Sequence, residues 1–350
     1  MDSSSFDNDV NNPFMLTDIE QIRSNGATSD TFKVRIYGKW HFLKRPKKEF
    51  SEHPIYKTAF DKEFEIGSQI NHPNIVRYLK KGIDEKGIFL QTEYVDGWTL
   101  NEFIDKNLHY FKYKDHAYRF TEQLLSALNC LHTHRILHLD LKPENIMITY
   151  IGLDVKLIDL GFAYSNEYLY QSIGRTDKYA APEQLASDNN SINQCADIYG
   201  FGNILLYLFT KTSNRKLIRK IPQPFRDCVD KCLQFNPFDR FQSIGNIQSF
   251  LRKKRFERKV LTVFWIAFPF LILFFSILAS SSHSYSVEPI LVDTPQPFEP
   301  IHINEEIKSK TPFMTKLLFQ MLKIGIVGCI GLIVSYRLTK RKRKKNTINR

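Results

Sequence analysis

The stretch HLDLKPEN, residues 138–145, places three chemically complementary side chains within eight positions of the chain. Asp140 offers a carboxylate, Lys142 a cation and Asn145 an amide oxygen. Transfer of a phosphoryl group requires a carboxylate beside the attacking oxygen, a cation on the phosphate and oxygen ligands for Mg²⁺. The three residues therefore suit phosphoryl transfer.

Seven of these eight positions match HRDLKPEN, so the stretch resembles the catalytic loop of the eukaryotic-type, or Hanks-type, Ser/Thr protein kinases. The resemblance implies that the chain binds ATP and Mg²⁺ and acts on a protein substrate with a Ser or Thr acceptor. It also implies that Asp140, Lys142 and Asn145 are catalytic. Leu139 replaces the arginine that in this family reads phosphorylation of the activation loop. We therefore expect activity that depends little on such phosphorylation.

The chain contains further motifs of the same family, before and after this stretch, in the family's order. They are HPNIV (72–76), DLG (159–161), GRTDKYAAPE (174–183), DIYGFG (197–202) and NPFDR (236–240). The resemblance covers residues 17–254 and implies an α+β, bilobal fold, with a small β-rich N-lobe over about 17–92 and a larger helical C-lobe over about 97–254. It further implies that Asp197 supports the catalytic-loop backbone and that Glu183 and Arg240 form a buried ion pair.

The resemblance also implies a lysine on the ATP phosphates that pairs with a glutamate. Lys44 ends a strand-like run, and Glu63 follows nineteen residues later in a helical pattern. These two are the expected ion pair, with the neighbouring Lys47 as the alternative lysine. Asn145 and Asp159 are the expected protein ligands of Mg²⁺.

Five other residues are expected at the nucleotide and substrate sites. Gly26 is the glycine that remains of the family's Gly-rich loop. The backbone of Glu93 and Val95 would bind adenine at the hinge between the lobes. Met147 would contact the nucleotide, and Thr176 would lie between the carboxylate and the lysine of the catalytic loop.

Three departures from the family pattern leave a second hypothesis open. The Gly-rich loop retains one glycine, Phe42 stands where a small alanine usually packs on adenine, and Gly67 stands where a bulky apolar residue usually joins the regulatory spine. These departures are compatible with a pseudokinase, a membrane-tethered scaffold that binds partners and transfers nothing. The polar residues of the chemistry are all present, however, and a scaffold has no physical reason to keep them together.

Hydrophobic periodicity predicts the elements around these motifs. Alternating apolar and polar residues between 19 and 44, interrupted by Asn25-Gly26, predict hairpin strands. Apolar residues at helical spacing from 117 to 134 predict a helix that leads into the catalytic loop. The five cysteines contain no CxxC pair and indicate reduced, buried thiols.

The formal net charge of +12 is concentrated beside apolar segments. Residues 252–259 carry a net charge of +5 and residues 337–350 a net charge of +8, which leaves −1 for the rest of the chain. Nucleic-acid binding is therefore the lesser explanation for the basic character. The 20 residues of 260–279 contain no charge. At ~1.5 Å per residue they cross a hydrocarbon core of about 30 Å, so this is the expected transmembrane helix, with 255–259 as its basic juxtamembrane flank.

The remaining segments complete a predicted transmembrane helical hairpin. Residues 280–313 are rich in Ser, Pro and acids and are expected to be an extracytoplasmic linker. Residues 317–336 are expected to form a second transmembrane helix, with an interfacial amphipathic helix as the alternative, and their glycines favour self-association. With 337–350 as a basic cytoplasmic tail, the positive-inside rule predicts a kinase domain on the cytoplasmic side of a plasma or inner membrane. Residues 1–16 are expected to be a disordered lead without a secretory signal.

Overall fold

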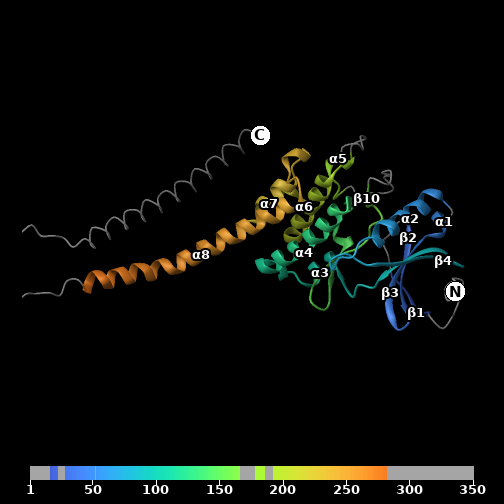
Figure 1. Cartoon of the computed structure of the whole chain (residues 1–350), viewed down its shortest axis with the longest axis horizontal. Coiled ribbons are helices and arrows are strands. Elements are labelled where there is room, and N and C mark those ends of the chain that lie inside the picture. Colours follow the sequence, from blue (N-terminus) through green and yellow to red (C-terminus); the bar gives the residue numbers. More distant parts are fainter. Residues whose placement is uncertain (1–15, 23–27, 52, 166–177, 186–191, 282–350) are drawn as a thin grey trace, which may run out of the picture. The chain divides into compact units, whose positions relative to one another are not determined.

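The computed structural model describes residues 16–22, 28–51, 53–165, 178–185 and 192–281. The chain separates into two compact units, Met1–Lys259 and Val260–Arg350. Within the first unit, a β-rich part is followed by a helical part (Figure 1). This arrangement agrees with the expected α+β fold of two lobes.

A five-stranded antiparallel sheet forms the N-lobe. Its strands are β1 (Leu16–Ile22), β2 (Ser29–Ile36), β3 (Lys39–Pro46), β4 (Tyr78–Asp84) and β5 (Gly87–Glu93), in the order β1-β2-β3-β5-β4. Tyr37 and Gly38 both have positive φ, which suits a two-residue hairpin between β2 and β3. The hairpin strands predicted between residues 19 and 44 are confirmed.

Side chains alternate between the two faces of β3. Leu43 joins Val34 and Phe89 in a small apolar cluster. Because successive residues of a strand point to opposite faces, Phe42 and Lys44 share the other face. The strand thereby separates the residues that stabilise the sheet from the lysine expected at the ATP phosphates.

Helix α2 (Pro54–Ser68) carries Glu63 and follows the short α1 (Lys48–Ser51). It begins at a proline, which is tolerated in the first turn of a helix, and the His53 ring accepts the N–H of Ile55. Its buried residues recur at helical spacing, so one face of α2 packs inward. They are Phe60, Glu63, Ile66 and Gly67.

The segment between α2 and β4 is bound to strand β9 (Val155–Leu157) of the C-lobe. The Leu157 N–H donates to the Asn74 carbonyl at 2.8 Å, and the Val76 N–H donates to the Leu157 carbonyl at 2.9 Å. The Asn74 side chain adds a bond to the Val155 carbonyl at 2.8 Å. The start of β4, two residues further on, is thereby attached to the helical lobe.

Among the described residues, the C-lobe combines helices α3 to α7 and the start of α8 with short strands in the sheets β6-β8-β9 and β10-β7. The helices are α3 (Leu100–Lys106), α4 (Lys114–Thr133), α5 (Pro182–Leu185), α6 (Gln194–Thr210) and α7 (Phe225–Cys232). The other strands are β6 (Gly97–Thr99), β7 (Ile136–Leu137), β8 (Ile146–Thr149) and β10 (Tyr164–Ser165). Short 3-10 helices cover Tyr110–Lys112, Pro143–Asn145, Arg215–Lys220 and Pro237–Asp239.

Helices α4 and α6 form the centre of the C-lobe core. Helix α4 confirms the helix predicted over 117–134, and its apolar face is buried. Helix α6 is buried on almost every side, which places Asp197 of its first turn in the interior. Of the described cysteines, Cys195, Cys228 and Cys232 are buried and form no disulfide, as expected, whereas Cys130 forms none but is half-buried.

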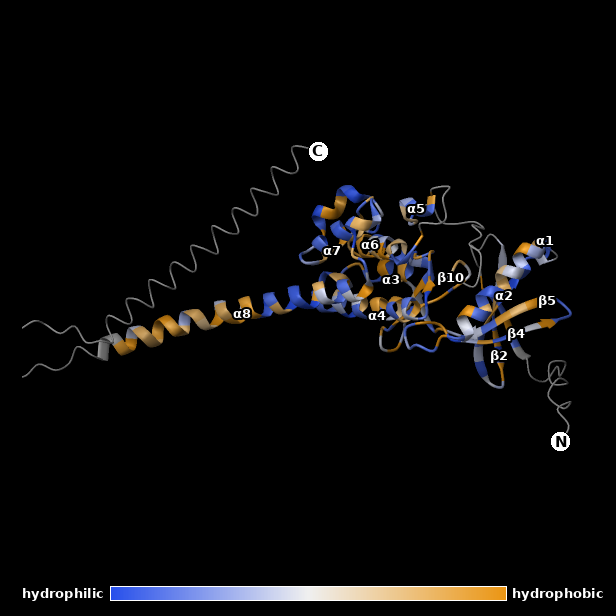
Figure 2. Ribbon diagram, turned by 45° about the horizontal axis from the view of Figure 1, so that its top comes forward, coloured by the Kyte–Doolittle hydropathy of each residue, from blue (hydrophilic) through white to orange (hydrophobic). Residues whose placement is uncertain are grey.

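The last described helix, α8 (Ile244–Ser281), has two different parts. Near its start, Ile244, Ile247 and Leu251 are buried in the C-lobe core. From 260 to 278 the residues are mostly apolar (Figure 2) and mostly exposed. Within the part of the chain that the structure describes, this is the one helix long and apolar enough to cross a membrane, judged by length and composition, with a mean hydropathy of 2.5 over its most apolar 18 residues.

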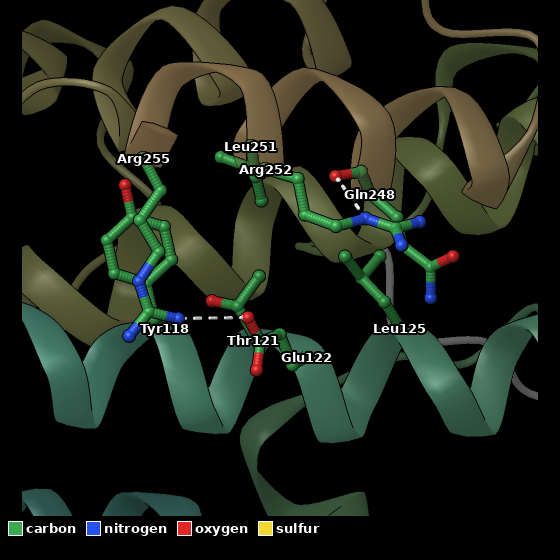
Figure 3. Close-up of a pocket in the computed structure, with 8 residues that line it drawn as sticks. All are labelled: Tyr118, Thr121, Glu122, Leu125, Gln248, Leu251, Arg252 and Arg255. Atoms are coloured by element: carbon green, nitrogen blue, oxygen red, sulfur yellow. Dashed lines mark hydrogen bonds and ion pairs between the residues drawn. The ribbon is translucent and has the colours of Figure 1, made fainter. Parts of the chain in front are cut away.

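A cavity of about 360 Å³ lies between α4 and the first part of α8 (Figure 3). The Arg255 guanidinium pairs there with Asp115 at 3.0 Å and with Glu122 at 3.2 Å, and it lies over the ring of Tyr118. None of the site residues expected from the sequence lines this cavity. The contacts of Arg255 attach the start of α8 to the C-lobe.

Candidate active site

Lys44 is the centre of a charge cluster between the two lobes. Its Nζ atom lies 2.8 Å from Glu63 Oε2, 3.1 Å from Glu63 Oε1 and 2.9 Å from Asp159 Oδ1. The lysine comes from β3, the glutamate from α2 and the aspartate from the segment after β9. The predicted Lys44–Glu63 ion pair is therefore present, and it is made by Lys44 rather than by Lys47.

Two members of the cluster, Lys44 and Asp159, keep their charges despite burial, whereas burial raises the pKa of Glu63. Burial alone would lower the pKa of Lys44, but the charges of Asp159 and Glu63 outweigh it and raise that pKa above its usual value. Burial likewise opposes ionisation of Asp159, yet the Lys44 charge and its hydrogen bond lower the pKa of Asp159 to about 2. The Gly161 N–H also donates to Asp159 Oδ1 at 2.9 Å. Lys44 and Asp159 are thus both ionised at neutral pH.

The catalytic-loop side chains converge on Asp140. Its Oδ2 atom lies 2.6 Å from Lys142 Nζ and accepts a hydrogen bond from Asn145 Nδ2 at 3.0 Å. Asn145 Nδ2 also donates to the Asp140 carbonyl at 2.9 Å. The Ile158 N–H donates to the Asn145 carbonyl at 2.9 Å, which places Asn145 beside the residue that precedes Asp159.

Asp197 holds the backbone of the catalytic loop. Its carboxylate accepts the N–H of His138 at 2.9 Å and the N–H of Leu139 at 2.8 Å, and His132 Nε2 lies 2.8 Å from Oδ2. Burial opposes ionisation, but the hydrogen bond from His132 and its charge lower the pKa of Asp197. Leu139 has φ of 62°, an unusual value for a residue with a side chain, so the buried carboxylate also stabilises a strained backbone.

Leu139 lies in apolar surroundings where the family has an arginine. It is 6% exposed and clusters with Ala181, just before α5, and Ala196 of α6. Its carbonyl accepts a hydrogen bond from Gln184 Nε2 at 2.9 Å. The described contacts of Leu139 with the start of the α5 region therefore include apolar packing and a neutral hydrogen bond.

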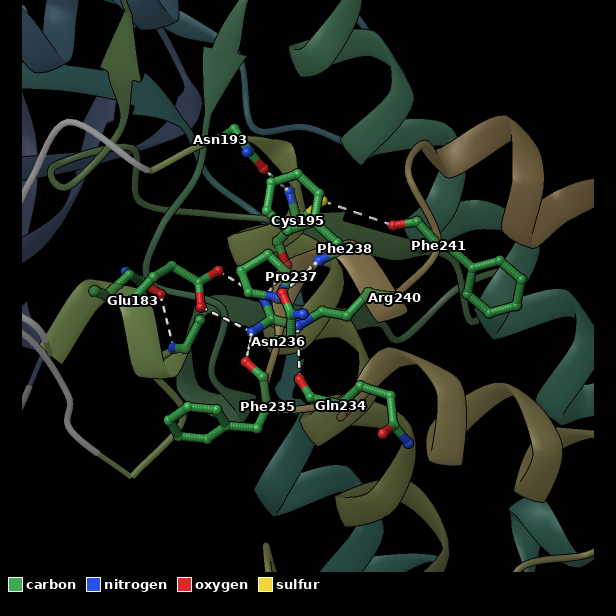
Figure 4. A network of polar contacts seen from close by, with 12 residues as sticks. Glu183, Asn193, Cys195, Gln234, Phe235, Asn236, Pro237, Phe238, Arg240 and Phe241 are labelled. Carbon is green, nitrogen blue, oxygen red and sulfur yellow. Dashed lines mark hydrogen bonds and ion pairs between the residues drawn. The ribbon is translucent and has the colours of Figure 1, made fainter.

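Glu183 and Arg240 form the buried ion pair expected from the sequence (Figure 4). The two nitrogens of the guanidinium lie 2.6 and 2.8 Å from the two carboxylate oxygens. Arg240 also donates to the carbonyls of Cys195 at 2.8 Å, Gln234 at 2.8 Å and Phe235 at 2.9 Å. Arg240 thus makes five hydrogen bonds, and among the side chains only arginine offers five N–H donors. The ion pair joins α5 to the segment before α8.

The residues expected at adenine lie where the lobes meet. Glu93 ends β5, and its side chain is bound by Lys156 Nζ at 2.6 Å. Val95 is buried, and Met147 is half-buried in β8. These positions are compatible with the expected contacts, which use mainly backbone groups and an apolar side chain.

Two expected site residues, Gly26 and Thr176, lie outside the described residues. Phe42 pairs with Thr92 across strands β3 and β5. Its ring lies on the same face of β3 as Lys44, where the family usually has a small residue.

Tyr78 is not among the site residues expected from the sequence, yet its hydroxyl reaches the charge cluster. It donates to Glu63 Oε1 at 2.9 Å and accepts the N–H of Leu160 at 3.0 Å. In the sequence, the feature that points to Tyr78 is Gly67. A glycine on the buried face of a helix leaves space in the core, and another side chain must fill that space.

The oxygens of Asp159 and Asn145 are the donors that a magnesium ion would meet. This hard ion prefers oxygen and is usually held by one or two protein ligands together with substrate phosphates. Among the described residues, no group of three or more His, Cys, Asp or Glu side chains is arranged to hold a metal. One carboxylate and one amide oxygen fit an ion that is shared with phosphates.

Comparison with known proteins agrees with this geometry. A family model described as a protein kinase domain matches residues 25–218. The chain is 33% identical over 172 residues to a probable serine/threonine-protein kinase PknB of Lactococcus lactis. This match covers 48% of the present chain and 27% of the relative. It is 27% identical over 217 residues to the serine/threonine-protein kinase PrkC of Bacillus subtilis, with 54% and 32% covered. It is also 27% identical over 223 residues to calcium-dependent protein kinase 5 of Plasmodium falciparum, with 56% and 38% covered.

A β-rich lobe and a helical lobe that meet at a lysine, two acidic partners and a catalytic loop define a protein of the kinase class. The chain belongs to the protein kinase domain family, because the family model covers more than half of its length. The matches span less than two fifths of the length of the three relatives.

Proposed function

We propose that this chain is a protein serine/threonine kinase that transfers the γ-phosphate of Mg-ATP to protein hydroxyls at the cytoplasmic face of a membrane. The observation that carries the proposal is the Lys44 ammonium, which contacts both Glu63 and Asp159 although they lie 19 and 115 positions away. A lysine held in this way presents its charge to the ATP phosphates, beside a carboxylate suited to Mg²⁺.

Each remaining site residue has a role that follows from its position. Asp140 accepts the proton of the acceptor hydroxyl, and Lys142, 2.6 Å from its carboxylate, balances the charge of the γ-phosphate. Asn145 orients Asp140 through its amide nitrogen and offers its amide oxygen, with the Asp159 carboxylate, to the metal. Asp159 and Asn145 would hold a magnesium ion, which when bound would supply positive charge against the negative charge of the transferred phosphate.

A pseudokinase scaffold is the second candidate, and Phe42 is the observation that favours it. Its ring shares a face of β3 with Lys44, so it reduces the room for adenine. The charge cluster speaks against a scaffold. Buried charges carry a desolvation penalty, which a protein that transfers nothing has no need to maintain around Lys44.

The full-length chain in detergent micelles, incubated with labelled Mg-ATP and a generic basic protein, tests the proposal. Asp140→Asn is expected to lower transfer by about 100-fold or more, since a positioned general base contributes roughly 10²–10⁴-fold. Asp105→Asn is the matched control, because Asp105 is an exposed residue of α3 paired with Lys211. We expect label on Ser or Thr of the substrate with the unaltered chain and the control. Equal label with the unaltered chain and both variants, or label with none of them, would reject the kinase and favour the scaffold.

The membrane part of the proposal rests on the apolar half of α8. Residues 260–279 carry no charge, those described are largely exposed, and they follow the basic run 252–259. By the positive-inside rule the kinase domain faces the cytoplasm. The second apolar stretch, 317–336, lies outside the described residues, so the hairpin and its self-association are proposed from the sequence alone.

Protease added to intact cells or spheroplasts tests this topology. We expect cleavage within 281–312 and protection of the kinase domain until the membrane is permeabilised. Deletion of 260–279 together with everything that follows should move the kinase domain to the soluble fraction. Cleavage of the kinase domain in intact cells would contradict the proposed orientation.

A further inference from the structure

Tyr78, the first residue of β4, fills the space beside Gly67 on α2. A Cβ atom at Gly67 would lie closer than 3.0 Å to three atoms of the Tyr78 ring. Both residues are buried. A glycine lowers the stability of a helix, but here it lets an aromatic ring approach the helix backbone. The two residues are therefore complementary in shape, and neither can be enlarged alone.

The Tyr78 hydroxyl makes two hydrogen bonds of different kinds. It donates to Glu63 Oε1 at 2.9 Å and accepts the N–H of Leu160 at 3.0 Å. Burial and the neighbouring charges of Glu63 and Asp159 raise the pKa of Tyr78 well above its usual range, so the hydroxyl keeps the proton that it donates. One oxygen atom thus links the glutamate that orients Lys44 to the backbone next to Asp159.

The backbone on both sides of the ring is held in place. Before it, the Asn74 carbonyl and the Val76 N–H bond to the backbone of Leu157 in β9 at 2.8 and 2.9 Å. At Tyr78 itself, β4 pairs with β5 opposite Thr92. The backbone that carries the ring is therefore attached to the sheet and to the C-lobe, so a shift of α2 or Leu160 relative to β4 would break a hydrogen bond of the hydroxyl.

We infer that Tyr78 is a positioning residue that holds the Lys44–Glu63 ion pair and the backbone of Leu160 in one arrangement. The inference deepens the proposed kinase function and rests on it for its kinetic consequences. Movement of Glu63 away from Lys44 leaves the hydroxyl proton without its acceptor, and movement of Leu160 leaves its N–H without a partner. The two halves of the phosphate site are thereby coupled through a single side chain.

Tyr78→Phe keeps the ring and removes this coupling. The Leu160 N–H then becomes a buried donor without its acceptor, so arrangements in which it reaches water become more populated. When only a fraction of the molecules is competent to bind, the apparent dissociation constant rises in inverse proportion to that fraction. We expect about a ten-fold increase in KM for ATP and in the dissociation constant of Mg-ADP, equivalent to about 1.4 kcal/mol, with kcat much less affected.

The cycle of Gly67→Ala with Tyr78→Leu tests the packing separately. Gly67→Ala alone displaces the ring and should raise KM for ATP as Tyr78→Phe does. Combined with Tyr78→Leu, which vacates the ring position, the added methyl group should have little further effect, so the two changes are not additive. Tyr118→Phe is the matched control, because its buried hydroxyl has no hydrogen-bond partner within the described part of the chain. It should leave KM and kcat unchanged.

Hydrogen exchange of the Leu160 amide and calorimetry with Mg-ADP are measured beside transfer, on the full-length chain in detergent. Faster exchange at Leu160 in Tyr78→Phe, with weaker Mg-ADP binding and an unchanged exchange pattern in α4 and α6, supports the inference even if no variant transfers phosphate. Values of KM, Mg-ADP affinity and Leu160 exchange equal to those of Tyr118→Phe would overturn it. So would a fall in kcat at unchanged KM with faster exchange throughout the C-lobe, which indicates general loosening. If Tyr78→Phe does not fold, Gly67→Ala decides the question on the same measurements.

Discussion

Glu183→Gln is expected to destabilise the kinase domain by removing the charge that balances a fully buried guanidinium. The Arg240 side chain is 0% exposed and that of Glu183 is 8% exposed. Removal of one partner of a buried ion pair costs about 3–5 kcal/mol, because the other charge stays buried without compensation. Arg240 keeps three backbone carbonyls as acceptors, and glutamine keeps one side-chain oxygen. The cost should therefore fall near the lower end, about 3 kcal/mol.

Thermal unfolding of the full-length chain in detergent measures this cost. For a domain of about 150–250 residues, each kcal/mol corresponds to a shift in Tm of roughly 2–4 °C, so Glu183→Gln should lower Tm by about 6–12 °C. Asp105→Asn is the matched control: it removes the charge of an ion pair in which Asp105 is 70% exposed. Such exposed pairs contribute about 0–1 kcal/mol. A Tm for Glu183→Gln equal to that of the control would refute the assignment of a compensating charge to Glu183.

Three further outcomes are expected. Lys44→Met should weaken Mg-ATP binding in calorimetry and lower transfer by about 100-fold or more, because a preorganised electrostatic donor is lost. Circular dichroism should show an intact fold. Binding of Mg-ATP as tight as by the unaltered chain would contradict the role of Lys44. Because Lys44 lowers the pKa of Asp159 from 3.8 to about 2, the stability from their contact is present above a pH of about 4 and is lost as the pH falls toward 2. Thermal unfolding should show a smaller acid-dependent loss over this range in Asp159→Asn, and equal losses would contradict the assignment. Phosphatase treatment should leave the transfer rate nearly unchanged, because Leu139 meets Ala181 by apolar packing, and a collapse in rate would show that a phosphate is needed.

Much of the charge cluster could be predicted from the sequence, because the resemblance to the Ser/Thr protein kinases implies a lysine that pairs with a glutamate. Periodicity placed Lys44 in an alternating strand and Glu63 on a helix, and the resemblance assigned the two to each other. The pairing of Glu183 with Arg240 was likewise predictable from short motifs in the expected order. Gly26 and Thr176 lie outside the described residues, and for them the prediction stands as made.

By itself the sequence determined which side chains carry charge, the order in which they follow and the apolar stretch that follows the basic run. The tertiary structure alone decided that Tyr78 fills the space beside Gly67 and reaches both Glu63 and Leu160. The tertiary structure also decided that Leu139, which stands in place of the family's arginine, is enclosed by apolar neighbours. The physical reason is that charge and periodicity are properties of a local stretch, whereas the occupant of a void is set by whichever distant side chain has the volume and the hydrogen-bonding group to fill it.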